Sequence, residues 1–247
     1  DPLEDAELLE DAEPQIGKAE ELRVKWGVET GQLWQLGEHR LICGDCTDRA
    51  VLDRVMQGER ADMVFTDPPY GINYQGGHNA RKREKLAGDD SGDLYPAFFG
   101  ILDLVCHDKA PLYVWFCGAV GEPIYSAVAK SGYTVRSMIV WNKLDAHYGA
   151  YMAQYMPKHD PCLYCVKSPP VWYGPTNEVT VWDVKQPTIN VYHPTQKPVE
   201  LADRAIKNSS DRNAIVFDGF VGSGTTLISC ERLGRRCRAV DISPAYC

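Results

Sequence analysis

The tetrapeptide Asp67-Pro68-Pro69-Tyr70 contains the residue types that point most directly to chemistry. It follows the apolar run at 61–66, and open α/β sheets bind ligands at the carboxyl ends of their strands. Two prolines remove two N–H donors and leave carbonyl oxygens that can only accept hydrogen bonds. A carboxylate beside such a carbonyl suits both hydrogens of an NH2 group on a flat nucleobase, on which Tyr70 can stack. In isolation, the tetrapeptide would instead indicate a tight turn with a surface tyrosine.

A second candidate site is the glycine-rich sequence DGFVGSGTT at 218–226, between an expected strand and an expected helix. Such a turn brings backbone amides and the positive end of the helix dipole close to a ligand. Its spacing matches neither GxGxxG nor GxxxxGK[ST], which weakens the dinucleotide and nucleoside-triphosphate interpretations. Asp241 ends the next expected strand, where an acid can accept both hydroxyls of a ribose. Together they indicate a cofactor that contains adenosine, although Asp241 alone could simply cap a helix.

The nine cysteines include two CxxC pairs, Cys43/Cys46 and Cys162/Cys165, with His159 near the second pair. A zinc site with four ligands can be assembled from them on paper. However, Cys162 and Cys165 stand among alternating strand-forming residues, and free cysteine is a common core residue. We therefore predict core cysteines and no metal.

Short apolar segments alternate with amphipathic segments, which predicts a parallel sheet covered by helices on both faces. The expected strands are 39–43, 61–66, 111–116, 134–142, 160–167, 214–218 and 236–242. The expected helices are 47–56, capped by Thr47, and 93–107, 122–132, 198–209 and 225–234. The connection 71–92 is too long for a tight turn and is a candidate functional loop. Residues 143–192 are irregular and rich in tyrosine and tryptophan.

Length and composition indicate a globular chain of 247 residues, with 44% hydrophobic and 24% charged residues. That length suits one large α/β domain, with two small domains as the alternative. The longest apolar run is far shorter than the ~20 residues that span a bilayer. Residues 1–22 hold nine acidic residues and one lysine, and therefore have a net charge of −8. The whole chain has the same net charge, so residues 23–247 are neutral overall. We expect an acidic, flexible tail over 1–30 and a cytosolic protein.

The chain resembles the amino-group DNA methyltransferases that use S-adenosylmethionine, in the permuted (beta) motif order. The resemblance runs from about Gly31 to Cys247 and rests on GDC, DPPY, HPTQKPVEL and DGFVGSGT in the family's order. It implies a Rossmann-like α/β fold with a mostly parallel seven-stranded sheet and one antiparallel strand. The segment KHDPCLYCVK resembles the family's antiparallel strand. It also implies a catalytic domain over 31–247, with a small target-recognition region at about 143–192.

The resemblance also implies a role for particular residues. The catalytic residues are Asp67, Pro68, Pro69 and Tyr70. The cofactor's methionine side is assigned to Asp218, Phe220, Gly222 and Gly224, its ribose to Asp241, its adenine to Asp45, and its carboxylate to Thr195 and Lys197. The implied cofactor site further includes Cys46, Asp67, Ser223 and Thr225. Gly219 and Val221 depart from the usual DPFGGSG, from which we expect a looser turn that still binds.

The implied reaction is methyl transfer from S-adenosylmethionine to adenine N6 in DNA, with the base flipped out of the duplex. Asp67 favours adenine, because members that act on cytosine N4 more often have serine there. The same reaction on cytosine N4 or on RNA remains an alternative. A non-catalytic DNA-binding or cofactor-binding subunit is a further alternative, and a measured methyl transfer would exclude that one. A dinucleotide oxidoreductase is disfavoured by the glycine spacing.

The expected partner is DNA, which a basic loop after the tetrapeptide could contact through its phosphates. Its cations are Arg81, Lys82, Arg83 and Lys85. A solvated loop without a partner is the alternative. A homodimer is an open possibility, and no membrane or metal partner is expected. The resemblance suggests a restriction-modification setting in the cytoplasm of a prokaryotic or phage-infected cell.

Overall fold

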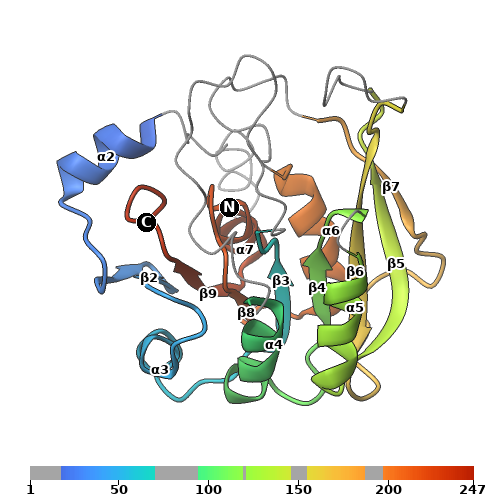
Figure 1. Cartoon of the computed structure of the whole chain (residues 1–247), viewed down its shortest axis with the longest axis horizontal. Helices are drawn as coiled ribbons and strands as arrows, with labels where there is room; N and C mark the ends of the chain where they lie inside the picture. The colour runs from blue at the N-terminus through green and yellow to red at the C-terminus, as the bar shows by residue number, and fades with distance from the viewer. Residues whose placement is uncertain (1–17, 70–93, 119–120, 146–154, 187–196) are drawn as a thin grey trace, which may run out of the picture.

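The computed structural model describes residues 18–69, 94–118, 121–145, 155–186 and 197–247, in which the strands form one sheet (Figure 1). The described strands are β1 (Leu33–Leu36), β2 (His39–Cys43), β3 (Met63–Thr66), β4 (Leu112–Trp115), β5 (Thr134–Asn142), β6 (His159–Val166), β7 (Val181–Asp183), β8 (Ile215–Asp218) and β9 (Arg236–Asp241). The described helices are α2 (Ala19–Trp26), α3 (Arg49–Met56), α4 (Leu94–Val105), α5 (Gly121–Lys130), α6 (Val199–Ser209) and α7 (Thr225–Leu233).

The sheet has nine strands among the described residues, in the order β1-β2-β9-β8-β3-β4-β6-β5-β7. The strands from β2 to β4 in this order are parallel, whereas β6 is antiparallel to both of its neighbours. The seven strands from β2 to β5 in this order therefore form the predicted sheet with one antiparallel strand. The edge strands β1 and β7 are additions to that prediction.

The last two strands of the chain, β8 and β9, lie in the middle of the sheet between β2 and β3. Their position brings the carboxyl ends of four neighbouring parallel strands to one edge of the sheet. Motifs that are far apart in the sequence therefore meet at this edge, as expected of an open α/β sheet.

Helices cover both faces of the sheet and bury a separate apolar layer on each (Figure 1). Leu52 of α3, Phe98 of α4 and Ile124 of α5 belong to the layer on one face. Leu201 of α6 and Cys230 of α7 belong to the layer on the other face. The predicted Rossmann-like α/β architecture is thus confirmed.

The start of α3 differs from the sequence prediction. Asp48, not Thr47, caps this helix, since its side chain accepts a hydrogen bond from the backbone N–H of Ala50. The Thr47 hydroxyl instead donates to the carboxylate of Asp45 at 2.8 Å. The Thr47 side chain is thus bound to Asp45 and does not cap the helix.

Part of the range expected as an acidic tail is helical. α2 follows residues 1–17, which lie outside the described residues, and none of its side chains is buried. It ends at Gly27, whose φ of +62° is favourable for glycine. Among the described residues, no helix has both the length and the apolar character needed to cross a membrane.

Candidate active site

The predicted motifs meet where parallel strands end at one edge of the sheet. Asp67 follows β3, Asp218 ends β8, Asp241 ends β9 and Asp45 follows β2. A hydrogen bond connects the residue before the tetrapeptide to the glycine-rich sequence, because the Thr66 hydroxyl donates to the Asp218 carboxylate at 2.8 Å. Asp67, the next residue in the chain, is therefore fixed beside the glycine-rich sequence at 218–226, which we call the glycine turn.

The glycine turn is held by Asp241, whose side chain is only 8% exposed. One carboxylate oxygen accepts from the backbone N–H of Gly222 at 2.9 Å, and the other from Ser243 at 2.8 Å. Burial raises the pKa of Asp241, against the effect of these two backbone donors. Asp241 thus joins the turn to the segment that follows β9.

Gly222 and Gly224 have the conformation and the surroundings that close approach of a ligand requires. Both have positive φ, +50° and +82°, which side-chain-bearing residues rarely adopt. A Cβ atom at Gly224 would meet no described atom within 4 Å, and one at Gly222 only a carbonyl oxygen at 3.9 Å. The backbone of the turn is therefore accessible to a bound group.

Gly219 is required by packing against the neighbouring helix. A Cβ atom there would lie 2.6 Å from the Phe98 ring, closer than packed atoms can be. Phe98 also packs against Phe220, with 5.1 Å between the ring centres. The glycine that replaces the family's proline thus makes room for Phe98 in α4.

Asp218, which was predicted to line the methionine side of the cofactor, is buried among hydrogen-bond donors of its own protein. Asp218 is 3% exposed, and its carboxylate accepts hydrogen bonds from the hydroxyls of Thr66 and Thr226 and from the backbone N–H of Phe220. Burial raises the pKa of Asp218 to about 6, although these three donors act in the opposite direction. Asp218 therefore fixes the glycine turn to β3 and α7, and any contact with a cofactor would be additional to this role.

The raised pKa of Asp218 gives a testable pH dependence. The folded state holds the proton more tightly than the unfolded chain, so this group stabilises most at low pH and loses that effect as pH rises through about 6. Relative to Asp218→Asn, the free energy of unfolding of the wild type should fall by about 2 kcal/mol between pH 4 and pH 7. Denaturant titrations of both proteins at each pH measure this change, and a difference independent of pH would contradict it.

Other predicted cofactor residues lie around the turn. The Thr225 hydroxyl donates to the backbone oxygen of Lys197 at 3.1 Å, and this bond joins the start of α7 to the segment before α6. The same hydroxyl lies 3.2 Å from the hydroxyl of Ser223. Cys46 is buried, and burial raises the pKa of its thiol. Asp45 is exposed, and its carboxylate accepts from the backbone N–H and the hydroxyl of Thr47.

Lys197 pairs with the predicted catalytic carboxylate. Its ammonium lies 2.7 Å from Asp67 Oδ2, 3.7 Å from Asp160 Oδ2 and 5.4 Å from the ring centre of Trp115. Lys197 was predicted to approach the carboxylate of a cofactor, whereas the structure places it on Asp67. Pro68 is buried and Pro69 half-buried beside Asp67. Tyr70, Thr195 and the cations Arg81, Lys82, Arg83 and Lys85 lie outside the described residues.

Asp160 and its partner Lys143 were missed by the sequence interpretation. Lys143 follows β5, Asp160 lies on β6, and their charged atoms are 2.9 Å apart. Both residues are far in sequence from Asp67; Asp160 lies in the segment KHDPCLYCVK, which was interpreted only as a strand. Only the pairing of β6 with both β4 and β5 could have shown that they lie near Lys197.

The predicted core cysteines of β6 are buried on opposite faces of the sheet. Cys162 packs in the apolar layer beneath α6, and Cys165 in the layer beneath α4 and α5. This follows from the period of two along a strand, which directs residues three apart to opposite sides. The two thiols therefore cannot bind one metal ion from β6. No cluster of three or more metal-binding side chains was found among the described residues.

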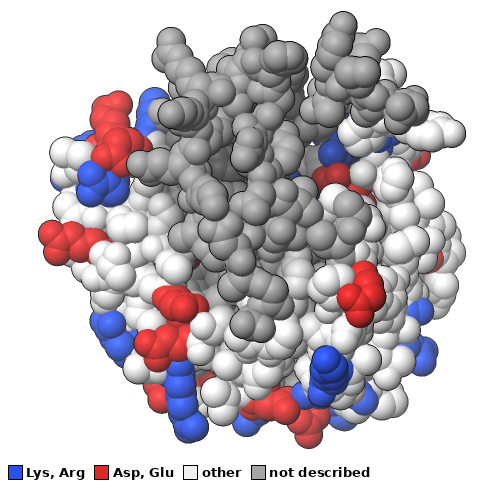
Figure 2. Space-filling model, viewed as in Figure 1, with Lys and Arg blue, Asp and Glu red and all other residues white. Residues whose placement is uncertain are grey.

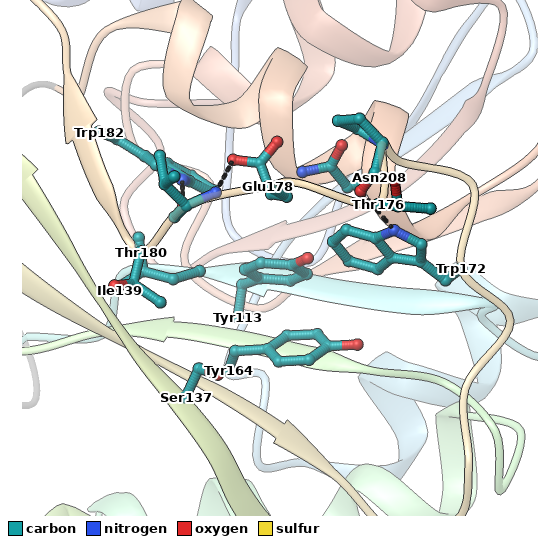
Figure 3. Close-up of a pocket in the computed structure, with 12 residues that line it drawn as sticks. Tyr113, Ser137, Ile139, Tyr164, Trp172, Thr176, Glu178, Thr180, Trp182 and Asn208 are labelled. Carbon is teal, nitrogen blue, oxygen red and sulfur yellow. Dashed lines mark hydrogen bonds between the residues drawn. The ribbon is translucent and has the colours of Figure 1, made fainter.

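A cavity of about 200 Å³ lies at the other end of α6 (Figure 3). Its lining includes Tyr113, Tyr164, Trp172, Glu178, Trp182 and Asn208. Asn208 is near the last residue of α6, whereas Lys197 precedes the first, so the two are roughly 15 Å apart along the helix. The cavity contains none of the predicted site residues.

Comparison with known proteins agrees with this arrangement. Residues 61–247 match the family model N6_N4_Mtase, described as DNA methylase. YubD of Escherichia coli (strain K12), which is named as a methylase, is 30% identical over 214 residues, 84% of this chain and 86% of that protein. The type II methyltransferase M2.DpnII of Streptococcus pneumoniae is 26% identical over 227 residues, 77% of this chain and 81% of that protein.

Two solved structures have the same fold. M1.HpyAVI in its complex with SAM has a TM-score of 0.63 at 22% identity, covering 83% of this chain and 94% of that chain. The PvuII DNA methyltransferase, described as cytosine-N4-specific, has a TM-score of 0.63 at 14% identity, covering 88% and 84%. At these identities the likeness shows the fold alone. The family match over 61–247 shows that the chain belongs to the N6/N4 family of DNA methylases.

Proposed function

We propose that this DNA methyltransferase methylates the N6 amino group of adenine, with Asp67 and Pro68 binding the amine. The observation that carries the proposal is the direct contact between the two motifs, in which Thr66, next to Asp67, donates to Asp218 of the glycine turn at 2.8 Å. A carboxylate that can bind an amine thus lies beside a backbone that can approach a cofactor. The presence of Asp67 in place of serine supports adenine over cytosine.

The cofactor is S-adenosylmethionine, which supplies, when bound, a methyl group on a sulfonium leaving group. The residues present fit it, since Gly222 and Gly224 have open space beside their backbone and Asp45 exposes a carboxylate at the same edge. We assign the turn to the methionine side and Asp241 to the ribose.

The chain's own contribution to the reaction is to bind and orient the amine. The exocyclic nitrogen of adenine is a poor nucleophile, because its lone pair is delocalised into the ring. Hydrogen bonds from its two hydrogens to Asp67 and the Pro68 carbonyl would localise that lone pair and direct it. Because the leaving group is already excellent, positioning and electrostatics supply most of the rate.

The substrate assignment is tested by identifying the methylated nucleoside. DNA treated with the protein and S-adenosylmethionine is digested to nucleosides and separated by mass spectrometry. N6-methyldeoxyadenosine is the expected product, and N4-methyldeoxycytidine alone would contradict the adenine assignment. Treated RNA serves as the second substrate, and absence of methyl transfer to either would favour a non-catalytic subunit.

We further propose that the basic loop contacts DNA and that the irregular part of 143–192 recognises the target. On the described surface in Figure 2, lysine and arginine lie interspersed with aspartate and glutamate. The loop, which lies outside the described residues, concentrates four cations within 81–85 and follows Asp67-Pro68-Pro69-Tyr70. Because it follows that motif directly in the sequence, we propose that it docks a duplex close to the reacting base.

Replacing Arg81, Lys82, Arg83 and Lys85 with serine should weaken DNA binding evenly across sequences. Each phosphate contact contributes about 0.9 to the slope of log affinity against log salt, so the slope should flatten by roughly two to four units. Fluorescence anisotropy at several salt concentrations measures it. Serine at Lys109 and Lys130, which follow α4 and end α5 far from the site edge, is the control. A wild-type slope in the quadruple variant would exclude the loop from the interface.

A further inference from the structure

Asp67 is one end of a row of alternating charges that crosses four elements of the fold. The charge row consists of Lys143 after β5, Asp160 on β6, Lys197 before α6 and Asp67 after β3. Successive charged atoms are 2.9 Å, 3.7 Å and 2.7 Å apart. A change of charge at one member therefore changes the electrostatic potential at its neighbours, which lie within ion-pair distance.

The inner ammonium of the charge row is buried and confined. Lys197 is 7% exposed, and burial tends to lower its pKa, yet the attraction of Asp67 and Asp160 raises the pKa overall and keeps the group charged. The ammonium groups of Lys197 and Lys143 lie 5.4 Å and 5.1 Å from the ring centres of Trp115 and Trp141. These two rings pack edge to face, so both lysines rest on one rigid aromatic pair.

We propose that Asp160 is a positioning residue for the reaction, which acts on Asp67 through Lys197. An ammonium 2.7 Å from a carboxylate draws on its negative charge and weakens it as an acceptor for other donors. Asp160, 3.7 Å from the same ammonium, offsets part of that charge and helps to fix where the ammonium lies. Lys143 in turn holds Asp160 in place at 2.9 Å. The inference rests on the proposed role of Asp67 in binding the target amine.

A purely structural role for Asp160 predicts a different result. The pair Lys143–Asp160 joins β5 to β6, and loss of such a clamp would lower the melting temperature and disturb every site on the sheet. A positioning role predicts instead a slower chemical step at nearly unchanged stability and cofactor affinity. The rate of a single turnover, compared with the Kd for S-adenosylmethionine, separates the two.

The test is Asp160→Asn, which keeps the size of the side chain and removes its charge. We expect the single-turnover rate of methyl transfer to fall on the order of 10- to 100-fold, as misplacement of a reacting group commonly causes. The Kd for S-adenosylmethionine should stay within about twofold, since no hydrogen bond or ion pair joins Asp160 to the glycine turn among the described residues. The matched control is Asp103→Asn in α4, where the acid is exposed, pairs with Lys167 and lies outside the residues assigned to the site or to target recognition. It should leave the rate unchanged.

A double-mutant cycle with Lys197→Met tests whether Asp160 acts through the lysine. If it does, adding Asp160→Asn to Lys197→Met should cause little further loss, whereas additive losses would overturn the inference. If Lys197→Met does not fold, Lys197→Gln takes its place.

The single variant decides the inference even without the cycle. A wild-type rate in Asp160→Asn overturns it, and so does a parallel loss of stability and cofactor binding. Failure of the proposed function has a separate signature, because Asp67→Ala would then still turn over.

Discussion

Asp67→Ala should slow methyl transfer on the order of 10²-fold or more, while the affinity for S-adenosylmethionine changes only a few-fold. The carboxylate is proposed to accept a hydrogen from the target amine, a contact that matters most as the nitrogen begins to bond to the methyl group. The glycine turn that we assign to the cofactor keeps its own anchors, Asp218 and Asp241, in this variant. Single-turnover kinetics and calorimetry measure the two effects separately.

The variant should still fold. Removing Asp67 takes a counter-ion from a buried ammonium, which by itself is strongly destabilising. Lys197 nevertheless retains Asp160, 3.7 Å away, as a second carboxylate. Asp62→Ala is the matched control, because this acid lies just before the start of β3 and accepts from the backbone N–H of Ile215. Near-normal turnover in Asp67→Ala, or an equal loss in Asp62→Ala, would contradict the role of Asp67.

Local patterns allowed much of the fold to be predicted. β5 occupies the predicted range 134–142, because alternation along nine residues specifies a strand well. α7 begins and ends as predicted, since glycines with positive φ, Gly224 and Gly234, flank it. The meeting of Asp67, the glycine turn and Asp241 followed from the parallel sheet.

Elements that depend on distant partners could not be predicted. β1 and β7 have four and three residues, too short for periodicity to show, and they exist because a neighbouring strand supplies their hydrogen bonds. The same limit applies to the site. Asp160 lies near Lys197 only because β6 pairs with β4, a relation between residues that the sequence separates widely.

Residue types were predicted more reliably than side-chain directions. Asp218 was expected to line the methionine side of the cofactor, and no sequence pattern showed that it also accepts three hydrogen bonds from its own protein. Thr66 and Thr226, which supply two of them, belong to other elements. The sequence indicated that an acid belongs at the end of this strand, but its orientation is decided by those neighbours.

Gly222→Val should weaken S-adenosylmethionine binding by at least about tenfold, because the backbone of the turn is where we place the cofactor's methionine side. The Cβ atom of the new side chain would meet no clash with the described protein, since the nearest atom is a carbonyl oxygen 3.9 Å away. It would instead fill the open space into which a cofactor must come. The remaining effect is backbone strain at a φ of +50°, about 1–3 kcal/mol for such conformations.

The control variant Gly234→Val separates the effect of backbone strain from the effect of blocking the cofactor site. Gly234 has a φ of +67°, ends α7 at the far end from the turn, and has no described atom within 4 Å of its Cβ position. Both variants should therefore lose similar stability in denaturant titrations, whereas only Gly222→Val should lose cofactor affinity in calorimetry. Equal affinities in the two variants would mean that the cofactor does not approach the turn at Gly222. Asp241, which holds that turn through the Gly222 N–H, would then have a structural role rather than one in binding ribose.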